Sequence, residues 1–358
     1  MPEFKVDARV FSKMIDFCNK LTGSEREKKF IRLYYDNGLK LFSTDGCLSA
    51  VFSLKQKCEP FTGVYELPIK TLRLLIEKKR ENDLYLALKK GEITLKIKNE
   101  LLTIATNTSK KIPPSPVFEM VGKFSVSSFF NGLDFATVHM PEDDKVFFFV
   151  KDGILYIISI YDNVFCIYNT GTQCNDIESA VPYQSVRHLI KAQKSVKSCS
   201  LNMGINQEGT SVGFQTSGLL TKICSRPVEN YESERILKLI HLYHETVPVS
   251  VLDKNGMKHD ITKTQRISPR TPIKARLTPE ALKLELKTTG LYYSCYRGIN
   301  EYTAEEAGIS FKFYGKYLKS ALSRLNRKAI TIFRKDEFYG IGDEDRERMI
   351  IIANLEVL

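Results

Sequence analysis

The sequence has no C-x-x-C pair of cysteines and no apolar run long enough to cross a membrane. A transmembrane helix needs about 20 consecutive apolar residues, whereas the longest apolar stretches, 146–150 and 153–160, are split by Lys151 and Asp152. No membrane-spanning segment is therefore expected. The eight cysteines are scattered, which excludes a zinc ribbon and a thioredoxin-type centre and favours reduced packing residues.

The start of the chain also lacks the continuous apolar core of a secretory signal. Glu3, Lys5 and Asp7 fall where such a core would have to lie. We therefore expect a cytoplasmic location.

Catalytic motifs are missing as well. The sequence has no G-x-x-x-x-G-K-[ST] phosphate loop and no G-x-G-x-x-G. His241 and His244 could ligate a metal on one helix face, but no carboxylate or cysteine stands at a suitable spacing from them. The acidic clusters 142–144 and 343–345 fall in expected turns and are interpreted as solvated loops. The sequence predicts no enzyme, no metal site and no cofactor; a DNA-processing enzyme with a cryptic metal site is the alternative from another class.

What the sequence does contain is enough apolar material for several folded cores. It has 358 residues, of which 43% are hydrophobic and 27% charged, and typical domains have about 100 to 150 residues. The formal net charge is +11, and the excess lies in the outer thirds of the chain. A basic balance of this size favours a polyanionic partner, although charge alone is a weak signal.

The most informative feature is internal repetition. An amphipathic helix is expected over 67–80, where Pro68 can occupy the first helical position. The same pattern of an apolar residue, a proline and further apolar residues returns over 181–194. A third copy runs over 313–325, with Tyr314 in place of the proline. Period-2 strands follow each copy, for example at 84–88, 93–97, 201–205, 212–214, 330–332 and 349–352.

A second strand-helix pattern precedes each of these copies. The pattern of residues 4–10 returns over 124–130, with Asp7 and Ser127 as expected N-caps. Hairpin turns follow at 36–38 and 152–153. The sequence therefore predicts three α+β domains, each made of two strand-helix-strands halves, over 1–120, 121–231 and 232–358.

Residues 232–272 carry the least clear pattern of the chain. We expect a strand at 247–251 and a helix over about 253–266, but Asn255-Gly256 could equally form a turn.

This arrangement resembles the β sliding clamp of bacterial DNA polymerase III over essentially the whole chain. Four stretches carry the resemblance. They are the domain-opening pattern of 124–135, the helix start at 181–182, residues 226–231, which resemble the family's R-F-P-D-Y turn, and residues 313–322, which resemble its F-N-x-x-Y-L helix. It implies three clamp domains whose helices line a central hole and whose antiparallel sheets lie outside.

The sequence also departs from the family. The family's T-D-G-H-R-L stretch is replaced here by 161–166, which keeps only the aspartate, while 44–46 keeps the T-D-G start in the first domain. The family's M-P-M-R-L ending is replaced by 353–358. A divergent clamp, or a clamp paralogue with different partners, is therefore expected.

The resemblance implies that cations on the repeated helices face DNA. Such cations would contact phosphates without reading bases, although lysine and arginine also solvate the polar face of any amphipathic helix. The candidates on the three repeated helices are Arg73, Lys78, Lys79, Arg80, Arg187, Lys191, Lys194, Lys197, Lys316, Lys319, Arg324 and Arg327.

The resemblance also implies a homodimeric ring that closes head to tail through sheet edges, and a cleft that accepts short apolar peptides of a DNA polymerase and a clamp loader. Core packing is the competing interpretation for several cleft residues. The expected pocket residues are Tyr161, Asn163, Val164, Phe165, Cys166, Pro227, Val228, Tyr231, Tyr314, Tyr317, Asn354 and Leu355. The expected function is that of a DNA sliding clamp, a processivity factor that encircles duplex DNA without sequence specificity.

Overall fold

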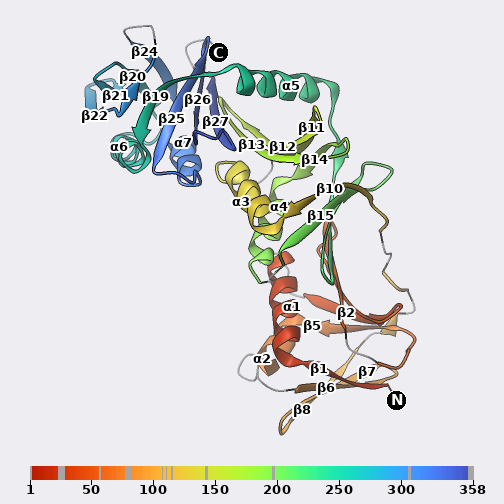
Figure 1. The fold of residues 1–358 in the computed structure, drawn as a ribbon. Coiled ribbons are helices and arrows are strands. Elements are labelled where there is room, and N and C mark those ends of the chain that lie inside the picture. The colour runs from red at the N-terminus through yellow and green to blue at the C-terminus, as the bar shows by residue number, and fades with distance from the viewer. Residues whose placement is uncertain are drawn as a thin grey trace. The chain divides into compact units, whose positions relative to one another are not determined.

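The structure is a computed structural model, and it describes residues 2–22, 29–55, 58–76, 83–106, 108–109, 111–113, 116–141, 144–195, 198–304 and 308–353. Its elements are mixed helices and antiparallel strands (Figure 1). The chain forms two compact units. Unit 1 comprises Met1–Val126 and Gln184–Arg226, and unit 2 comprises Ser127–Tyr183 and Pro227–Leu358. The units divide the middle of the three expected domains, so the three-domain boundaries stay a prediction.

The expected strand-helix-strands halves are confirmed as the repeating element of the fold. In unit 1, β1 (Glu3–Asp7) leads into α1 (Ala8–Leu21), which is followed by β2 (Phe30–Tyr35), β3 (Leu39–Thr44) and β4 (Leu48–Ser53). The second half runs from β5 (Val64–Pro68) through α2 (Ile69–Ile76) to β6 (Asp83–Lys89), β7 (Glu92–Ile97) and β8 (Glu100–Ala105), with the short β9 (Thr108–Ser109) after it.

The middle of the chain repeats the same order twice. First come β10 (Glu119–Ser125), α3 (Val126–Thr137), β11 (Lys145–Lys151), β12 (Ile154–Tyr161) and β13 (Val164–Gln173). Then follow β14 (Glu178–Pro182), α4 (Tyr183–Gln193), β15 (Ser200–Ile205), β16 (Ser211–Thr216), β17 (Leu219–Cys224) and the short β18 (Arg226–Pro227).

The last third adds one helix to this scheme. A long helix, α5 (Asn230–Glu245), precedes β19 (Val247–Asp253), α6 (Lys254–Ile267), β20 (Ile273–Leu277), β21 (Ala281–Thr288) and β22 (Leu291–Gly298). The short β23 (Glu301–Tyr302) is followed by β24 (Ile309–Phe313), α7 (Gly315–Leu322), β25 (Ala329–Lys335), β26 (Phe338–Gly342) and β27 (Arg348–Ala353).

The two units contain sheets of matching order. The nine-stranded sheet of unit 1 reads β10-β15-β16-β17-β4-β3-β2-β5-β9, and the ten-stranded sheet of unit 2 contains β19-β25-β26-β27-β13-β12-β11-β14-β18 in the same sense. Each unit also has a four-stranded sheet, β1-β6-β7-β8 and β24-β20-β21-β22. In each of these sheets, the strand that precedes one helix pairs with the first of the three strands that follow the other helix. These pairs are β1 with β6 and β24 with β20.

The repeated helices begin later than the sequence patterns predict. Pro68 and Pro182 are the last residues of β5 and β14, where they pair with Phe30 and Lys145, and α2 and α4 start at the next residue. A proline can end a strand because it has no N–H to donate to a further ladder position. The third copy starts at Gly315 after Tyr314, and it ends at Leu322 rather than Leu325.

Residues 232–272 contain the strand and helix that the sequence predicts there, because β19 and α6 cover both positions. Gly256 lies inside α6 rather than in a turn. A Cβ at Gly256 would collide with the Arg297 guanidinium, and Arg297 pairs with Asp260 of the same helix at 2.6 and 3.0 Å. The glycine therefore leaves room for this ion pair.

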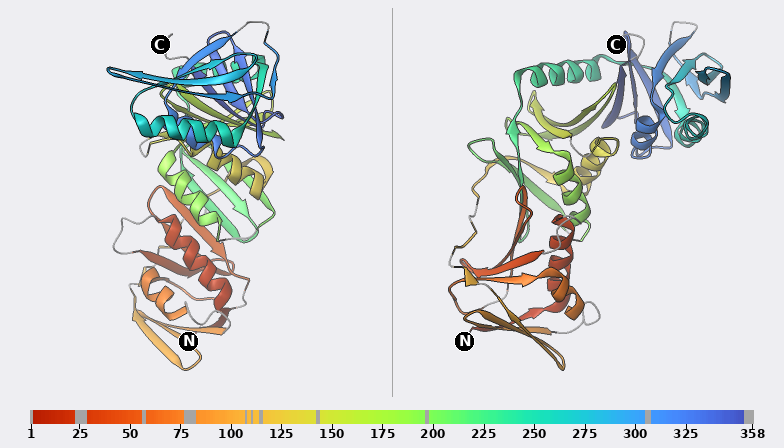
Figure 2. Two further views of the ribbon diagram at one scale, coloured as in Figure 1. Left: turned by 90° about the vertical axis from the view of Figure 1, so that its left-hand side faces the viewer. Right: turned by 180° about the vertical axis from the view of Figure 1, so that it is seen from behind.

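Helix α5 was not predicted from the sequence. It lies along the face of the ten-stranded sheet opposite to α7 (Figures 1 and 2). Its buried side chains Ile236, Leu239 and Ile240 share one apolar cluster with residues of β11 to β14 and β25 to β27. The other face of this sheet packs on α3, where the rings of Phe129 and Phe148 stack at 6.3 Å. In unit 2 the large sheet is thus covered on both faces.

Candidate nucleic-acid interface and partner surface

The helices of unit 1 present exposed cations beside their buried faces. Asp7 caps α1 by accepting the N–H groups of Arg9 and Val10 at 2.7 and 3.1 Å. This places Arg9 in the first turn of the helix, and Lys13 and Lys20 are exposed further along it. None of these three was among the sequence candidates. The amphipathic spacing that identified α2 could also have identified these three cations, because α1 has an apolar face of the same kind. The two helices pack side by side.

Among the sequence candidates in unit 1, Arg73 lies on α2 and its guanidinium contacts Asp16 of α1 at 3.4 Å. Lys191 on α4 and Lys194 just beyond it are exposed, and Arg187 is partly buried. Lys78, Lys79, Arg80 and Lys197 lie outside the described residues. In the described part of unit 1, four of the sequence candidates therefore lie on helices or at helix ends: Arg73, Arg187, Lys191 and Lys194.

In unit 2 the candidates lie on and just after α7. Lys316 is exposed on α7 and stands 5.8 Å from the ring centre of Tyr317, and Lys319 follows one turn later. Arg324 is exposed but forms a 2.6 Å ion pair with Asp134 of α3. Helix α6, which packs beside α7, adds the exposed Lys263 and Arg266. These two cations were not predicted because α6 is not one of the three repeated helices.

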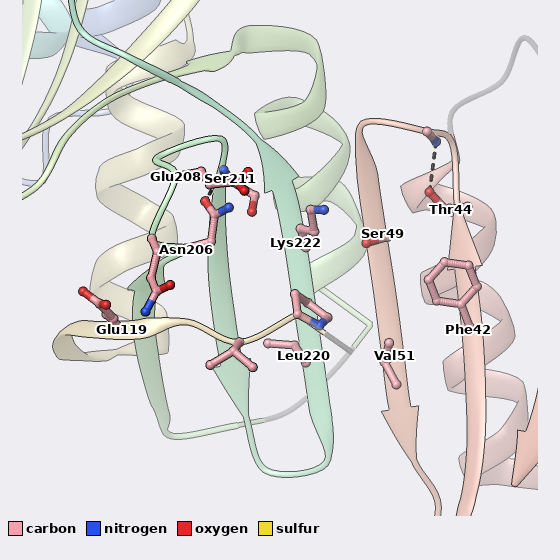
Figure 3. Close-up of a pocket in the computed structure, with 14 residues that line it drawn as sticks. Phe42, Thr44, Ser49, Val51, Glu119, Asn206, Glu208, Ser211, Leu220 and Lys222 are labelled. Carbon is pink, nitrogen blue, oxygen red and sulfur yellow. Dashed lines mark hydrogen bonds between the residues drawn. The ribbon is translucent and has the colours of Figure 1, made fainter. Parts of the chain in front are cut away.

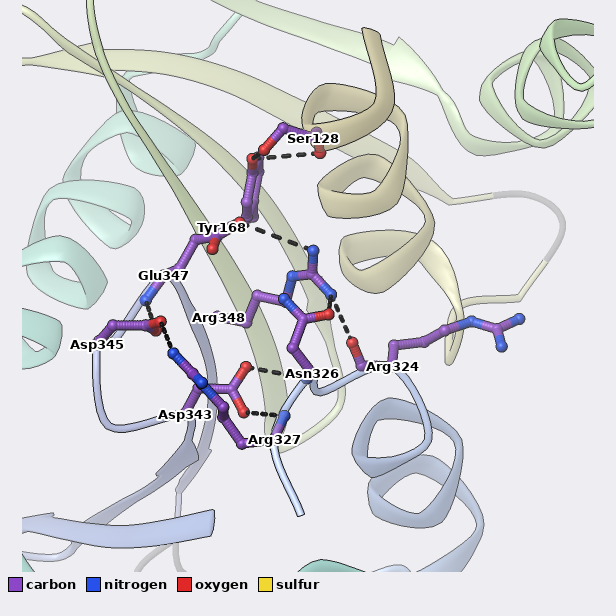
Figure 4. Close-up of polar contacts among 9 residues, drawn as sticks. All are labelled: Ser128, Tyr168, Arg324, Asn326, Arg327, Asp343, Asp345, Glu347 and Arg348. Atoms are coloured by element: carbon purple, nitrogen blue, oxygen red, sulfur yellow. Dashed lines mark hydrogen bonds and ion pairs between the residues drawn. The ribbon is translucent and has the colours of Figure 1, made fainter. Parts of the chain in front are cut away.

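A buried polar network fixes the turn that carries Arg324 and Arg327 (Figure 4). The Asp343 carboxylate, itself 1% exposed, accepts the backbone N–H groups of Asn326 and Arg327 at 3.0 Å each. Arg348 donates to the Arg324 carbonyl at 2.8 Å and to the Asn326 side chain at 2.7 Å. Asp343 is therefore a structural residue, and the interpretation of its acidic cluster as a fully solvated loop is wrong at this position.

These cations can contact a polyanion without reading sequence. Most sit on half-exposed helix faces, where ion pairs such as Arg73 with Asp16 contribute little because water and salt screen them. Phosphate oxygens can compete for such cations, and each contact formed would release counterions and depend on salt. The helix faces can therefore make weak phosphate contacts that do not depend on base sequence.

The expected pocket residues on β13 point to opposite faces of this strand. Successive side chains of a strand point to opposite faces, and β13 follows this rule. Phe165 belongs to the cluster under α5, and the Arg235 guanidinium of α5 stands 5.4 Å from its ring centre. Cys166 lies on the other face, where its thiol contacts His139 Nδ1 at 3.4 Å. Asn163, Val164 and Cys166 are fully buried, so these three side chains cannot form an open wall.

The remaining pocket residues form two separate groups. The hydroxyls of Tyr161 and Tyr317 lie 3.3 Å apart, and the Tyr314 ring lies 6.5 Å from the Tyr317 ring. Val228 instead packs against the cluster under α5. Pro227 is exposed, and Tyr231, in the first turn of α5, is 64% exposed. Asn354 and Leu355 lie outside the described residues.

The buried histidine and cysteine of unit 2 are electrically neutral. Burial lowers the pKa of His139 to about 4 and raises the pKa of the Cys166 thiol. A nucleophilic cysteine needs a lowered thiol pKa, whereas the pKa of the Cys166 thiol is raised. This pair is therefore not set up as a catalytic cysteine and histidine. His244 bonds to the Tyr156 hydroxyl at 2.9 Å and His241 to Glu245 at 3.1 Å. Within the described ranges no group of three or more His, Cys, Asp or Glu side chains is placed to hold a metal ion.

Comparison with known proteins identifies the fold. A DNA polymerase sliding clamp of Pseudomonas aeruginosa matches at a TM-score of 0.82 and 13% identity, over 99% of this chain and 100% of that one. The P. aeruginosa clamp bound to griselimycin (TM-score 0.80, 14% identity) and the Helicobacter pylori clamp bound to a DNA ligase peptide (TM-score 0.76, 11% identity) each match over 99% of both chains. No protein-family model and no curated protein matches the sequence.

The chain thus has the sliding-clamp fold along nearly its whole length, and at 13% identity it is a divergent example of it. In the part of the chain that the structure describes, none of the helices has the length and apolarity needed to span a membrane.

Proposed function

We propose that this protein is a DNA sliding clamp, a non-enzymatic processivity factor that encircles duplex DNA as a homodimeric ring in the cytoplasm. The observation that carries the proposal is the sliding-clamp fold over 99% of the chain, together with exposed cations on α1, α2, α4, α6 and α7. Two copies of a chain with this fold would enclose DNA, and the enclosure rather than affinity would hold the complex together. Weak phosphate contacts suit this role because a sliding protein must bind every sequence about equally.

Ring closure has a candidate pair of edges. β8 ends the four-stranded sheet of unit 1, and its Leu101 is 67% exposed. β22 ends the four-stranded sheet of unit 2 and exposes Tyr292 (58%) and Tyr296 (66%). Exposed sheet edges with apolar side chains pair readily with another chain. We therefore place the dimer interface between β8 of one copy and β22 of its partner.

The proposed partners are duplex DNA and proteins that dock through short peptides, such as a DNA polymerase and a clamp loader. A DNA ligase peptide bound to the H. pylori clamp supports peptide docking as a property of the fold. Docking raises the effective concentration of a polymerase at the primer end, which increases processivity without any chemistry by the clamp. A clamp paralogue with different partners is the second candidate, and the buried pocket residues of β13 favour it.

The test combines oligomeric state with topology. Light scattering after size exclusion should give a dimer, and the protein loaded on nicked circular DNA should be released when the circle is linearised. A monomer that binds linear and circular DNA equally would contradict the proposal.

A matched pair of variants tests the helix face. Lys191→Glu with Lys194→Glu should shorten retention on circles and reduce the slope of log K against log salt by roughly 0.9 for each phosphate that the variant no longer neutralises. The control, Lys89→Glu with Lys90→Glu, makes the same charge change at an exposed hairpin and should retain wild-type behaviour. Equal losses in both variants would show a general charge effect instead of a DNA-facing helix.

A further inference from the structure

A cavity of about 720 Å³ opens on the large sheet of unit 1, away from α1 (Figure 3). Val51 of β4 lines it, while the next residue, Phe52, points to the other face and packs edge-on against Phe17 of α1 at 5.2 Å. The cavity therefore lies on the outer face of this sheet. Its size falls within the range of about 300–1,000 Å³ that ligand sites occupy.

Two rows of cross-strand neighbours form the floor of the cavity, on β3, β4 and β17. One row is apolar and the other, nearer the β3–β4 turn, is polar. In order across the strands, the rows are Phe42, Val51 and Leu220, and Thr44, Ser49 and Lys222.

The same two rows exist in unit 2 on β12, β13 and β27, which occupy the corresponding places in the sheet order. There all six positions are apolar, and all belong to or pack against the cluster under α5. The rows are Ile158, Ile167 and Met349, and Ile160, Phe165 and Ile351. The cavity of unit 1 is thus the counterpart of a surface that the chain covers with its own helix in unit 2.

The polar row distinguishes the floor of this cavity from the corresponding surface of unit 2. Thr44, Ser49 and Lys222 stand where unit 2 has two isoleucines and a phenylalanine. Lys222 is half-buried and forms no ion pair with any residue that the structure describes. Lys222 is the one cation among the described residues that line the cavity, which also include the exposed Glu119 and Glu208. A carboxylate brought by a ligand would therefore pair with Lys222.

The segment 116–119 borders the cavity on one side. Phe118 packs over β15 and β16 at Gly213, where a Cβ would lie 2.6 Å from its ring. Pro116, Val117 and Glu119 consequently line one side of the cavity.

We propose that this cavity is a docking site for a short peptide of a partner protein. An apolar side chain of the peptide packs against Phe42, Val51 and Leu220, and an acidic residue beside it pairs with Lys222. This site rests on the proposed function, since a clamp acts by holding partners. It also moves the docking surface away from the buried β13 residues of the expected pocket, where the chain supplies α5 as its own cover.

The test begins with a random octapeptide library displayed on phage and selected against the full-length protein. The enriched peptides should combine a large apolar residue with a neighbouring Asp or Glu. A fluorescein-labelled copy of the best peptide is then titrated by anisotropy against four proteins: the wild type, Ser49→Phe, Lys222→Glu and Tyr231→Ala.

Ser49→Phe inserts the residue that unit 2 carries at the matching position and should fill the cavity, while Lys222→Glu should repel the acidic peptide. Each should weaken binding about tenfold or more, which equals a loss of roughly 1.4 kcal/mol. A peptide whose acid is changed to lysine should regain binding to Lys222→Glu, which a merely misfolded variant could not provide. Tyr231→Ala, on exposed α5 surface, should bind like the wild type.

Two results would overturn the docking site: no enrichment of any peptide, or peptides that bind Ser49→Phe normally and lose affinity in Tyr231→Ala. Retention of the same variants on circular DNA separates this test from that of the proposed function. If wild-type protein binds the peptide at the cavity but is not retained on circles, the clamp proposal fails while the docking site stands.

Discussion

The two large sheets of this protein share strand order but differ in what covers their outer faces. In unit 2, α5 buries an apolar face built from residues such as Phe165, Ile167 and Ile351. In unit 1, the corresponding rows contain Ser49, Thr44 and Lys222 and border an open cavity. The same scaffold thus has a closed outer face in one unit and an open one in the other. The repeated halves therefore build sheets of matching strand order, while the side chains on the outer faces of these sheets differ.

The largest expected effect comes from removing the packing that holds α5 on its sheet. Leu239 is 3% exposed in the cluster under α5, and Leu239→Ala should lower the free energy of unfolding by about 2–5 kcal/mol. Leu237 is 38% exposed on the same helix, so Leu237→Ala should have little effect. Urea denaturation followed by circular dichroism measures both. Similar losses in the two variants would mean that α5 is not a packed cover.

Acid should weaken unit 2 because burial lowers the pKa of His139 to about 4. An unfolded histidine has a pKa near 6.5, so between these values the unfolded chain binds the proton and the folded chain does not. The contribution of His139 to stability is therefore complete above about pH 6.5 and falls as the pH drops, by up to about 1.4 kcal/mol per pH unit.

Hydrogen exchange at pH 7 and pH 5 can locate this acid effect. Protection should fall mainly in β12 and β13 around the His139–Cys166 contact. His139→Phe, which removes the titrating group, should flatten the pH dependence of the unfolding free energy. An unchanged slope in this variant would assign the acid effect to other groups.

The repeated halves could be predicted from the sequence because each carries a local pattern. Strand residues such as Leu84, Leu86 and Leu88 alternate in the sequence, and the structure buries all three. The long helix was missed although its signal was present: Ile236, Leu239, Ile240 and Tyr243 follow helical spacing and are all buried. It was overlooked because no other half has a helix at this place, so a search for repeats could not find it.

The candidate site was less predictable because it depends on which face of a strand each residue occupies. The resemblance placed the consecutive residues Val164, Phe165 and Cys166 in one pocket, but strand geometry sends Phe165 to one face and its neighbours to the other. The cavity of unit 1 needs residues from the β3–β4 hairpin and from β17, which is far from that hairpin in sequence. Their proximity follows from the pairing of β4 with β17, which no local pattern reveals.

The smallest expected effect concerns how α5 begins. The Glu232 carboxylate accepts the Glu229 N–H at 3.1 Å and lies 3.8 Å from Lys145 Nζ on β11. Glu232→Ala removes both contacts and should cost about 0.5–2 kcal/mol, as loss of a helix cap does. Glu232→Gln keeps an oxygen for the N–H and loses only the ion pair, so its cost should be smaller. Glu234→Ala, at an exposed position of the same helix, is the control for helix propensity. If Glu232→Gln were as destabilising as Glu232→Ala in urea denaturation, the ion pair to the sheet rather than the cap would anchor the start of α5.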